Sequence, residues 1–383
     1  MSQSPIQVDM QVRFLDLAAQ TAPLRDEILA AIARIVDSQQ FILGEQVRRV
    51  EQQLAEYCGA RFAVGCASGS DALLLALKAS GVGAGDQVLT VPFTFFATAG
   101  AVTLAGATPV FVDVEADTFN IDVSRVEAAL DRHPRIKAIL PVHLFGGCAD
   151  MDAVNTLAAA RGTAVIEDAA QSIGSEYKDR RAGGIGTIGC FSFYPTKNLG
   201  AFGDGGLCTT NDEALAAKLR ALRVHGRTGT YYHEWVGLAS RLDGMQAAIL
   251  EVKLKYLDGW SRARARNAAL YSRLFTERGI PVIVPRPAPY QTRHIFHQYV
   301  IRAGPDRDRL QQFLKSRGVA SEVYYPLALH QQPCFSSLGH APGDFPVSEE
   351  LVRTVLALPV HSDLTEEQIE YVVEQVQAFY DGR

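Results

Sequence analysis

VIEDAAQSIGSEYKDRRAGGIGTIGCFSFYPTKNLGAFGDGGLCTT, residues 165–210, is the stretch that decides the fold. It holds two apolar runs typical of strands; Asp168 closes the first, and Lys197 ends the second. If both strands lie in one sheet, this carboxylate and this amine can meet. Pyridoxal phosphate chemistry requires such a pair, because the lysine forms a Schiff base with the aldehyde and the acid keeps the pyridine nitrogen protonated, so that the ring can accept electrons.

Strand-like and helix-like segments alternate outward from this stretch. Helical segments between several of the strands predict a largely parallel sheet that is covered on both faces. The last strand follows its predecessor too closely for a helical crossover, so we expect it to be antiparallel. The seven predicted strands are RFAVGCAS, QVLTVP, TPVFVDV, IKAILPVHL, TAVIED, IGCFSFYP and GGLCTT, at residues 61–68, 87–92, 108–114, 136–144, 163–168, 188–195 and 205–210.

Helical periodicity marks two segments before the first strand and others after the last. Residues 24–36 and 47–59 precede the sheet, and a long helical zone runs from Met245 to about Leu274. Beyond it, a helix is predicted at 309–318, and a final helix begins at a capping box of Thr365 and Gln368. Three further strands, PVIVP, HQYVIR and SEVYYP, are predicted at 281–285, 297–302 and 321–326. We expect a large domain over residues 1–265 and a smaller C-terminal α/β domain over 266–383.

Composition excludes several classes of protein. The formal charge of -5 gives no broad basic field, which argues against nucleic acid as a partner. The six cysteines form no CxxC pair and are expected to be reduced thiols packed in the interior. No apolar run is long enough to span a bilayer, and no signal peptide is recognisable, so we expect a cytoplasmic protein that binds no membrane.

Three motifs in fixed order resemble one family. EDAAQSIG, SFYPTKNLG and GDGG, at residues 167–174, 192–200 and 203–206, look like the sugar aminotransferases of the DegT/DnrJ/EryC1/StrS family, which are fold-type I enzymes of the aspartate aminotransferase superfamily. The resemblance runs from FLDLAAQ to YYPLALHQQP, about nine-tenths of the chain. It implies pyridoxal phosphate as cofactor, a homodimer with shared active sites, L-glutamate as amino donor and a nucleotide-linked keto-sugar as acceptor.

The resemblance also assigns roles around the cofactor. Lys197 matches the Schiff-base lysine, although a lysine after a strand is normally exposed to solvent. Some relatives carry histidine there and act as sugar dehydratases, so the lysine favours transamination. Asp168 matches the partner of the pyridine nitrogen, with a helix N-cap as its alternative. Gln171 matches the residue on the hydroxyl side of the ring.

A phosphate site is expected where the strand RFAVGCAS turns into a helix. Gly69 and Ser70 lie at that helix N-terminus, where free N–H groups bind anions, and Ser192 matches a residue that adds a hydroxyl. The alternative is simple capping by Ser70. In VPFTFFATA, Phe95 matches the aromatic residue stacked on the cofactor ring, and Phe96 is left to the core.

Substrate-side groups are less defined. His297 and His330 are candidates for substrate binding, against ordinary buried histidines. Tyr194 is a candidate for a hydrogen bond near the reacting carbonyl, and Arg241 could hold an anionic part of the substrate. No metal site is expected: His294 and His297 are three residues apart, but in a β-like run they would face opposite sides.

Two segments depart from a simple pattern. GGIGTIG, residues 183–189, contains a literal GxGxxG, but a polar segment precedes it and a β-like run follows, so a dinucleotide site is not expected. In VGLASRLDG, Ala239 stands where relatives usually carry an asparagine that reaches the cofactor phosphate of the neighbouring subunit. The departure puts the strength of phosphate binding in doubt, not the chemistry.

The leading hypothesis is therefore amination of a nucleotide-linked keto-sugar. The N-terminal VRFLDLAAQ, the VGLASRLD loop and YYPLALHQQP resemble members that aminate C3 of a 3-keto-6-deoxy sugar rather than C4. The alternatives are a C4 aminotransferase, a pyridoxal-phosphate-dependent sugar dehydratase and a cyclitol aminotransferase. An NAD-dependent sugar oxidoreductase and a catalytically silent regulator, which would sense pyridoxal phosphate or a sugar nucleotide, stay open as alternatives from other classes.

Overall fold

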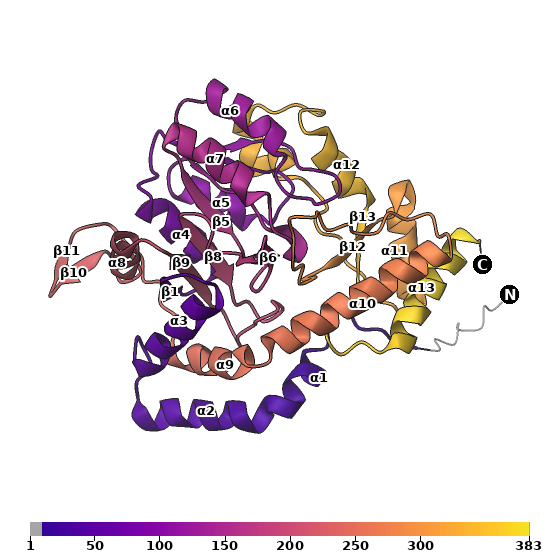
Figure 1. The fold of residues 1–383 in the computed structure, drawn as a ribbon, viewed down its shortest axis with the longest axis horizontal. Coiled ribbons are helices and arrows are strands. Elements are labelled where there is room, and N and C mark those ends of the chain that lie inside the picture. The colour runs from indigo at the N-terminus through magenta and orange to yellow at the C-terminus, as the bar shows by residue number, and fades with distance from the viewer. Residues whose placement is uncertain (1–9, 383) are drawn as a thin grey trace.

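A seven-stranded sheet lies at the centre of the computed structural model, which describes residues 10–382 (Figure 1). Its strand order is β1-β9-β8-β5-β4-β2-β3, and only β9 runs antiparallel to its neighbours. All seven predicted strands are confirmed, including the antiparallel one. The strands are β1 (Phe62–Cys66), β2 (Gln87–Thr90), β3 (Thr108–Phe111), β4 (Ile136–Ile139), β5 (Ala164–Asp168), β8 (Ile188–Ser192) and β9 (Gly206–Thr210).

Helices cover both faces of this sheet, as the continuous burial along its strands requires. In β2, Val88 packs on one face with α4 (Gly69–Ala79), α5 (Ala97–Leu104) and α8 (Glu213–Leu222). Its neighbour Leu89 packs on the other face with α6 (Val126–Arg132) and α7 (Met151–Arg161). The carboxyl ends of the parallel strands therefore lie between two layers of helices. Ligands bind at this edge in sheets of this kind.

The N-terminal helices wrap the lower edge of the sheet in Figure 1. After the short α1 (Leu17–Thr21), α2 (Arg25–Ser38) packs through Ile28 and Ile35 on α9 (Gly244–Leu254). α3 (Glu45–Tyr57) packs through Val50 and Leu54 on the sheet. The helices predicted before the first strand are thus confirmed.

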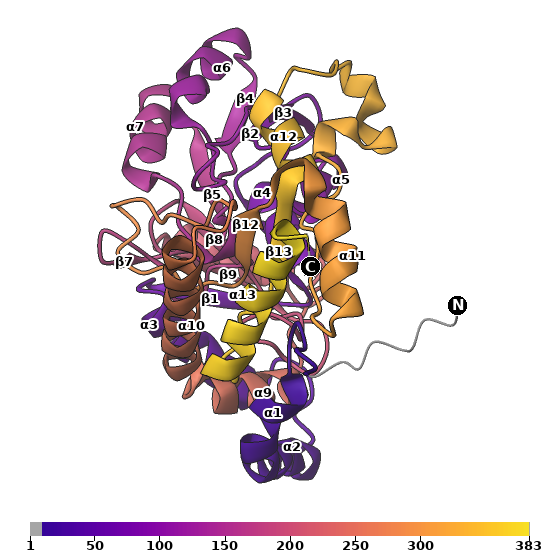
Figure 2. The same cartoon turned by 90° about the vertical axis from the view of Figure 1, so that its right-hand side faces the viewer.

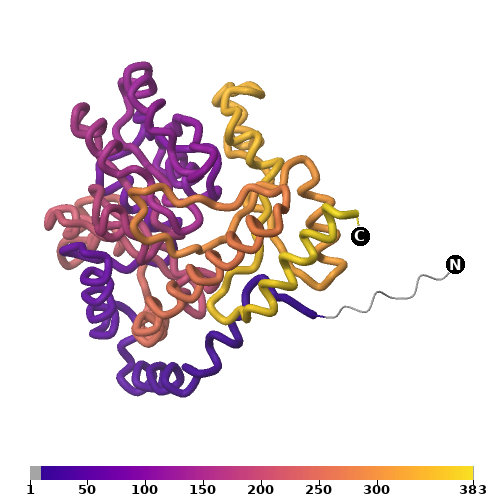
Figure 3. The backbone as a smooth tube through the Cα atoms, turned by 45° about the vertical axis from the view of Figure 1, so that its right-hand side comes forward, coloured from indigo at the N-terminus to yellow at the C-terminus, as the bar shows by residue number. Residues whose placement is uncertain are grey.

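The C-terminal part is built on α10 (Leu257–Glu277), which leads from α9 to α11 (Arg307–Ser316) and α13 (Glu366–Tyr380) (Figure 2). α13 begins at the predicted capping box of Thr365 and Gln368. α10 is continuous through residues 265 and 266, and Val12 packs with the C-terminal core. In Figure 3 the start of the described chain, in dark blue, runs beside the C-terminal part. The division into domains 1–265 and 266–383 stays a prediction, and residues 1–9 lie outside the described residues.

The predicted strands of this part are only partly correct. β12 (Tyr299–Arg302) is confirmed, but it pairs with β13 (Val355–Leu358), which follows α12 (Pro346–Thr354) and was not predicted. PVIVP and SEVYYP were wrong as strands, since each contributes a single bridge, at Ile283 and Glu322. PVIVP has a proline at each end and SEVYYP ends on Pro326; proline has no N–H to donate to a ladder, which limits pairing to such isolated contacts.

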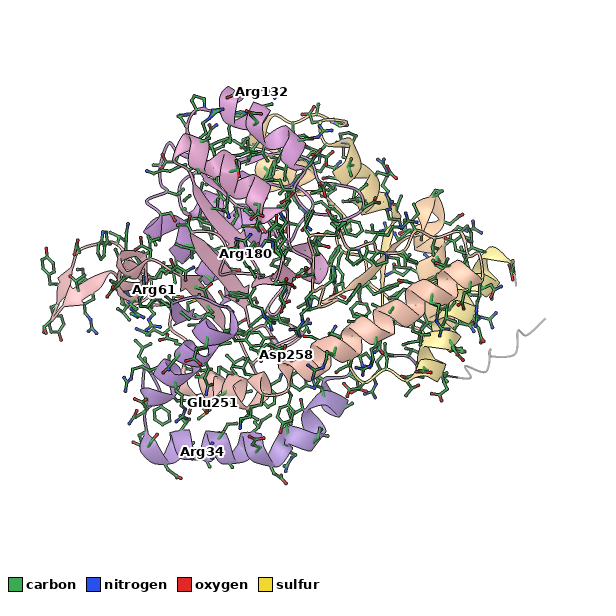
Figure 4. The ribbon with its side chains drawn as sticks, viewed as in Figure 1. Arg34, Arg61, Arg132, Arg180, Glu251 and Asp258 are labelled. Carbon is green, nitrogen blue, oxygen red and sulfur yellow. The ribbon has the colours of Figure 1, made fainter. Side chains whose placement is uncertain are left out.

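Asp258, labelled in Figure 4 at the start of α10, joins the C-terminal part to the rest. Its Oδ1 accepts hydrogen bonds from Tyr57 Oη of α3 at 2.8 Å and from Arg293 Nη2 at 2.6 Å. Two small hairpins complete the fold. One pairs β6 (Glu176–Tyr177) with β7 (Arg180–Arg181), and the other pairs β10 (Arg227–Gly229) with β11 (Tyr232–His233). The β10–β11 hairpin projects from the body of the molecule in Figure 1. Between residues 10 and 382, none of the helices combines the length and apolar character that a membrane span needs.

Candidate active site

A cavity of about 500 Å³ lies at the carboxyl ends of β5 and β8. It is closed by the N-terminus of α4 on one side and by residues 297–298 and 324–325 of the C-terminal part on another. Most predicted site residues line it, namely Gly69, Ser70, Phe95, Asp168, Gln171, Ser192, Tyr194, Lys197 and His297; Arg241 and His330 do not.

Lys197 lies in a turn just beyond β8, where its backbone N–H donates to the Tyr194 carbonyl at 2.8 Å. Removal from bulk water lowers the pKa of Lys197 to about 8, and the charge of Asp168 opposes that shift. Near neutral pH a useful fraction of the amine is therefore unprotonated and can act as a nucleophile or a base.

Asp168, at the end of β5, is buried, and both of its carboxylate oxygens have partners. Oδ2 accepts a hydrogen bond from Thr98 Oγ1 at 2.8 Å, and Oδ1 accepts one from the Ala170 N–H at 3.3 Å. Thr98 in turn lies 3.1 Å, Oγ1 to Oγ1, from Thr94. Burial raises the pKa of Asp168, although the Thr98 hydroxyl opposes this. No helix begins at Asp168 within the described chain, so the N-cap alternative is excluded.

The phosphate site stays a prediction, and the structure gives the geometry of the N-terminus of α4 where it is expected. The N-cap is Ser68, whose Oγ accepts from the Asp71 N–H at 3.1 Å, so the alternative of capping by Ser70 was wrong. The N–H groups of Gly69 and Ser70 belong to the first turn, where they have no intrahelical partner. A Cβ on Gly69 would lie 2.6 Å from the Cβ of Ser192, so only glycine allows this close approach of helix and strand.

Gln171 bridges two elements at the rim of the cavity. Its Oε1 accepts from the Phe145 N–H at 2.9 Å, and its Nε2 donates to Tyr325 Oη at 3.0 Å. Phe95 is 58% exposed and its ring centroid lies 6.3 Å from that of Tyr325. Phe96 was wrongly assigned to the core: it is 48% exposed and packs on Phe335, because α5 begins directly after it and turns its ring outward.

His297 and His330 occupy different environments. His297 lines the cavity, with Nδ1 2.9 Å from Asn198 Oδ1. His330 lies outside it, with Nε2 3.3 Å from Glu349 Oε1 and its ring centroid 4.7 Å from that of Phe345. Its role in substrate binding stays a prediction. The Leu329 N–H donates to the Pro92 carbonyl at 2.8 Å, which fixes this segment at the end of β2.

Of Tyr194 and Arg241, likewise, only the first lines the cavity. Tyr194 lines the cavity and is 53% exposed. Arg241 does not line the cavity of its own chain. Ser240, directly before Arg241, accepts a hydrogen bond at its Oγ from the Ala67 N–H at 3.1 Å. Ala239 is exposed. Ser240 thus fixes the 239–241 loop beside the start of α4, and none of its three residues lines the cavity.

The GxGxxG segment binds a carboxylate of its own chain. Glu167 accepts hydrogen bonds from the N–H groups of Gly183, Ile185 and Gly186 at 2.7, 2.9 and 2.5 Å. Its Oε2 also lies 2.9 Å from His143 Nε2, and both side chains are fully buried. Although burial opposes it, these hydrogen bonds lower the pKa of Glu167 below its ordinary value. The expectation that this motif is no dinucleotide site is consistent with these bonds, since a strand rather than a helix follows it.

Sequence reasoning missed several residues of the site. Thr98, Asn198 and Tyr325 each hold a predicted site residue in place, and Gln298 and Asp204 line the cavity. A threonine three positions after Phe95 and an asparagine directly after Lys197 were the available signs. His, Cys, Asp and Glu side chains in the described residues form no group that could hold a metal ion.

The residues present fit pyridoxal phosphate. The helix N-terminus and Ser192 suit the phosphate, Asp168 suits the pyridine nitrogen, Phe95 suits the ring face, and Lys197 suits the aldehyde. The fit to the cofactor rests on the chemistry of these groups, because one amine, one buried carboxylate and free backbone N–H groups lie in a single cavity.

Comparisons with known proteins give one consistent result. Residues 23–377 match the DegT/DnrJ/EryC1/StrS aminotransferase family. A Geobacillus stearothermophilus protein named pleiotropic regulatory protein is 50% identical over 97% of this chain and 99% of its own. The UDP-N-acetyl-3-dehydro-α-D-glucosamine 3-aminotransferase of Acidithiobacillus ferrooxidans is 45% identical over 97% of this chain and 98% of its own. A crystal structure of S. venezuelae DesV in complex with a ketimine intermediate superposes with a TM-score of 0.93 at 42% identity, covering 96% of this chain and 98% of that one.

Proposed function

The chain belongs to the DegT/DnrJ/EryC1/StrS aminotransferase family, and we propose that it transfers an amino group from glutamate to a nucleotide-linked keto-sugar, with pyridoxal phosphate as cofactor. The observation that carries this proposal is the convergence of Lys197 and Asp168 on one cavity beside the N-terminus of α4. The name of the Acidithiobacillus ferrooxidans relative supports the nucleotide-sugar acceptor.

Each group of the cavity has a proposed task. Bound pyridoxal phosphate supplies an aldehyde that carries the amino group and a ring that accepts electrons. Gly69, Ser70 and Ser192 would hold its phosphate. Asp168, kept in orientation by Thr98, would keep the pyridine nitrogen protonated.

Lys197 and the groups around the ring complete these tasks. Lys197 Nζ would take a proton from the donor's α-carbon and return one to the former carbonyl carbon of the sugar, a role that its pKa of about 8 permits. Phe95 would cover the ring face and Gln171 would lie on its hydroxyl side. Tyr194 is proposed to donate a hydrogen bond near the reacting carbonyl.

We place the amination at C3 of a 3-keto-6-deoxy sugar. The name of the Acidithiobacillus ferrooxidans relative, a 3-aminotransferase, supports the position but not the deoxygenation. The alternatives are a C4 aminotransferase, a cyclitol aminotransferase and a sugar dehydratase, the last disfavoured by the lysine at 197. The groups that line the cavity near Lys197 would be common to the three aminotransferase candidates, so only substrate tests separate these.

A homodimer would complete the site. Among the described lining residues of the cavity, Lys197 is the one formally cationic side chain, beside the carboxylates of Asp168 and Asp204. A nucleotide sugar brings a diphosphate and glutamate brings two carboxylates, so further cations are required. We propose that the Arg241 loop of a second copy supplies them. The projecting hairpin, in which Tyr231 is 94% exposed, is a candidate contact with that copy.

A regulator is the second candidate function, because one relative carries the name pleiotropic regulatory protein. A regulator that senses pyridoxal phosphate would hold the same cofactor as the aminotransferase, so catalysis is what separates the two candidates. The test is to add glutamate to purified protein, follow the visible absorption of the bound cofactor and measure 2-oxoglutarate. A shift of the spectrum with stoichiometric 2-oxoglutarate supports the aminotransferase; a static spectrum supports a regulator, and the absence of visible absorption would revive the NAD-dependent alternative.

The cytoplasm is the proposed location. The six cysteines are free thiols and five of them are buried, which suits a reducing compartment.

A further inference from the structure

Asn198 holds the imidazole of His297 in one orientation. The two side chains are almost fully buried, with Asn198 Oδ1 2.9 Å from His297 Nδ1. The amide nitrogen, Asn198 Nδ2, donates to the Ile295 carbonyl at 3.4 Å. Because a carbonyl oxygen only accepts, that bond turns the amide nitrogen toward Ile295 and leaves Oδ1 facing the imidazole ring.

This orientation fixes the tautomer of His297. Asn198 Oδ1 can only accept, so His297 Nδ1 must carry a proton and donate it. Burial, reinforced by the charges of Lys197 and Arg264, lowers the pKa of His297 well below its ordinary value, so the ring is neutral. In a neutral ring with Nδ1 protonated, Nε2 keeps an unshared electron pair. Arg264 Nη1 holds the backbone in place by donating to the His297 carbonyl at 3.3 Å.

Nε2 is the ring nitrogen left for the cavity. His297 lines the cavity beside Lys197, and nothing in residues 10–382 donates a hydrogen bond to its Nε2. A neutral acceptor cannot bind a diphosphate or a carboxylate, both of which require donors or cations. It does suit a hydroxyl group, which donates a proton along the direction of the lone pair.

We propose that His297 and Asn198 form a hydroxyl-recognition pair, in which Nε2 of the neutral His297 accepts a hydrogen bond from the sugar hydroxyl on the carbon next to the reacting carbonyl. The inference rests on the proposed function and narrows its substrate class to keto-sugars with a free hydroxyl beside the keto group. Their deoxy counterparts leave Nε2 without a donor in a desolvated site, which lowers transition-state binding. Asn198 is a positioning residue, since it acts through His297.

The test uses two nucleotide keto-sugars that differ only in the hydroxyl next to the keto carbon. The wild type should show about tenfold higher kcat/KM for the hydroxyl compound, the scale of one neutral hydrogen bond. His297→Phe should reduce this ratio to about one, which is the value expected when no acceptor is present. His297→Gln should keep most of the ratio, because its amide nitrogen can donate to Asn198 while its Oε1 accepts. Asn198→Leu should lower the ratio, because the tautomer is no longer imposed.

His294→Phe is the matched control. His294 is three residues from His297 and does not line this cavity, and its Nδ1 accepts from the Phe296 N–H at 3.1 Å within its own loop. The ratio of the two kcat/KM values should stay as in the wild type. Because a ratio cancels a general loss of activity, it separates recognition of the hydroxyl from damage to the fold.

Three outcomes would overturn the inference. They are a wild type that treats both sugars alike, a His297→Phe variant with an unchanged ratio, and a His294→Phe variant that loses it. An unchanged ratio in His297→Phe would show that the ring serves Lys197 or the fold instead. The reaction with glutamate alone uses no sugar, so it tests the proposed function separately. If glutamate reacts but the ratio of kcat/KM values is not as expected, only the inference about His297 is wrong. If glutamate does not react, the proposed function is wrong as well.

Discussion

At the scale of single residues, the site depends on how two opposite charges are taken out of water. Burial lowers the pKa of Lys197 to about 8 and raises that of Asp168, so each group moves toward its neutral form when it stands without a ligand. The Thr98 hydroxyl and the Ala170 N–H stabilise the carboxylate form of Asp168. Pyridoxal phosphate would suit both groups, because its aldehyde reacts with a neutral amine and its protonated ring nitrogen pairs with a carboxylate.

Lys197→Ala should abolish amino transfer and remove the visible absorption of lysine-bound pyridoxal phosphate while the fold is kept. Lys197→Arg should not restore either, because its guanidinium stays protonated and cannot react with an aldehyde. Turnover and the absorption spectrum check this, with circular dichroism to monitor the fold. Near-normal turnover in the alanine variant would remove Lys197 from the mechanism.

The pKa of Lys197 predicts how fast cofactor-free enzyme takes up pyridoxal phosphate. Only the neutral amine attacks the aldehyde, so the rate should rise with pH and level off above about pH 8, where the group is deprotonated. Stopped-flow absorbance from pH 6.5 to 10 measures it. A rate that keeps rising toward the pH of an ordinary lysine, about 10.4, would show that the amine is not desolvated.

Asp168→Asn should retain some cofactor but reduce the rate by at least about 100-fold, because a neutral amide cannot stabilise a protonated pyridine. Thr98→Val should cause a smaller loss in kcat, about tenfold, since it removes one hydrogen bond to the carboxylate. Thr98→Ser, which keeps the hydroxyl, should restore most of it. Steady-state kinetics decide: equal rates in wild type and Asp168→Asn would assign the role to another acid.

At the scale of elements, the N-terminus of α4 joins fold and chemistry. Gly69→Ala would place a methyl group against Ser192 and should weaken cofactor binding by about tenfold, since overpacking costs about 1–3 kcal/mol. Gly259→Ala in α10 is the control, because nothing lies within 4 Å of the added carbon. It should leave binding unchanged and raise the stability of the helix by up to about 1 kcal/mol. Cofactor titration tests both; equal binding in the two variants would show that α4 does not hold the phosphate.

The elements also show what could be predicted from sequence. The central strands are continuous apolar runs between clear turns, so all seven were found. In the C-terminal part, proline-flanked segments such as PVIVP carry the same composition but lack the donors for a ladder, and the short β13 follows α12 without a turn. Asn198 and Tyr325 were missed because their roles depend on contacts with residues far away along the chain.

At the scale of the whole molecule, the proposal of a second copy rests on two observations: Arg241 lies outside the cavity of its own chain, and Lys197 is the single cationic side chain among the described lining residues. Ala239→Asn should tighten cofactor retention, or at least not weaken it, provided that this loop reaches the neighbouring site. One added hydrogen bond to a phosphate is worth about 1.5–3 kcal/mol at most. Dialysis followed by absorption of the remaining cofactor measures it, with light scattering to establish the dimer. Loss of cofactor from the variant, or a monomeric active enzyme, would contradict this arrangement.

The central claim is that this chain moves an amino group from glutamate to a nucleotide-linked keto-sugar. The direct measurement is to incubate the enzyme with ¹⁵N-glutamate and a panel of 3-keto and 4-keto sugar nucleotides, and to follow the label by mass spectrometry and its position by NMR. We predict a ¹⁵N-amino sugar nucleotide, labelled at C3, that forms with the wild type and not with Lys197→Ala. Label at C4 only would correct the position. The absence of label from every sugar, in an enzyme that converts glutamate to 2-oxoglutarate, would contradict the claim itself.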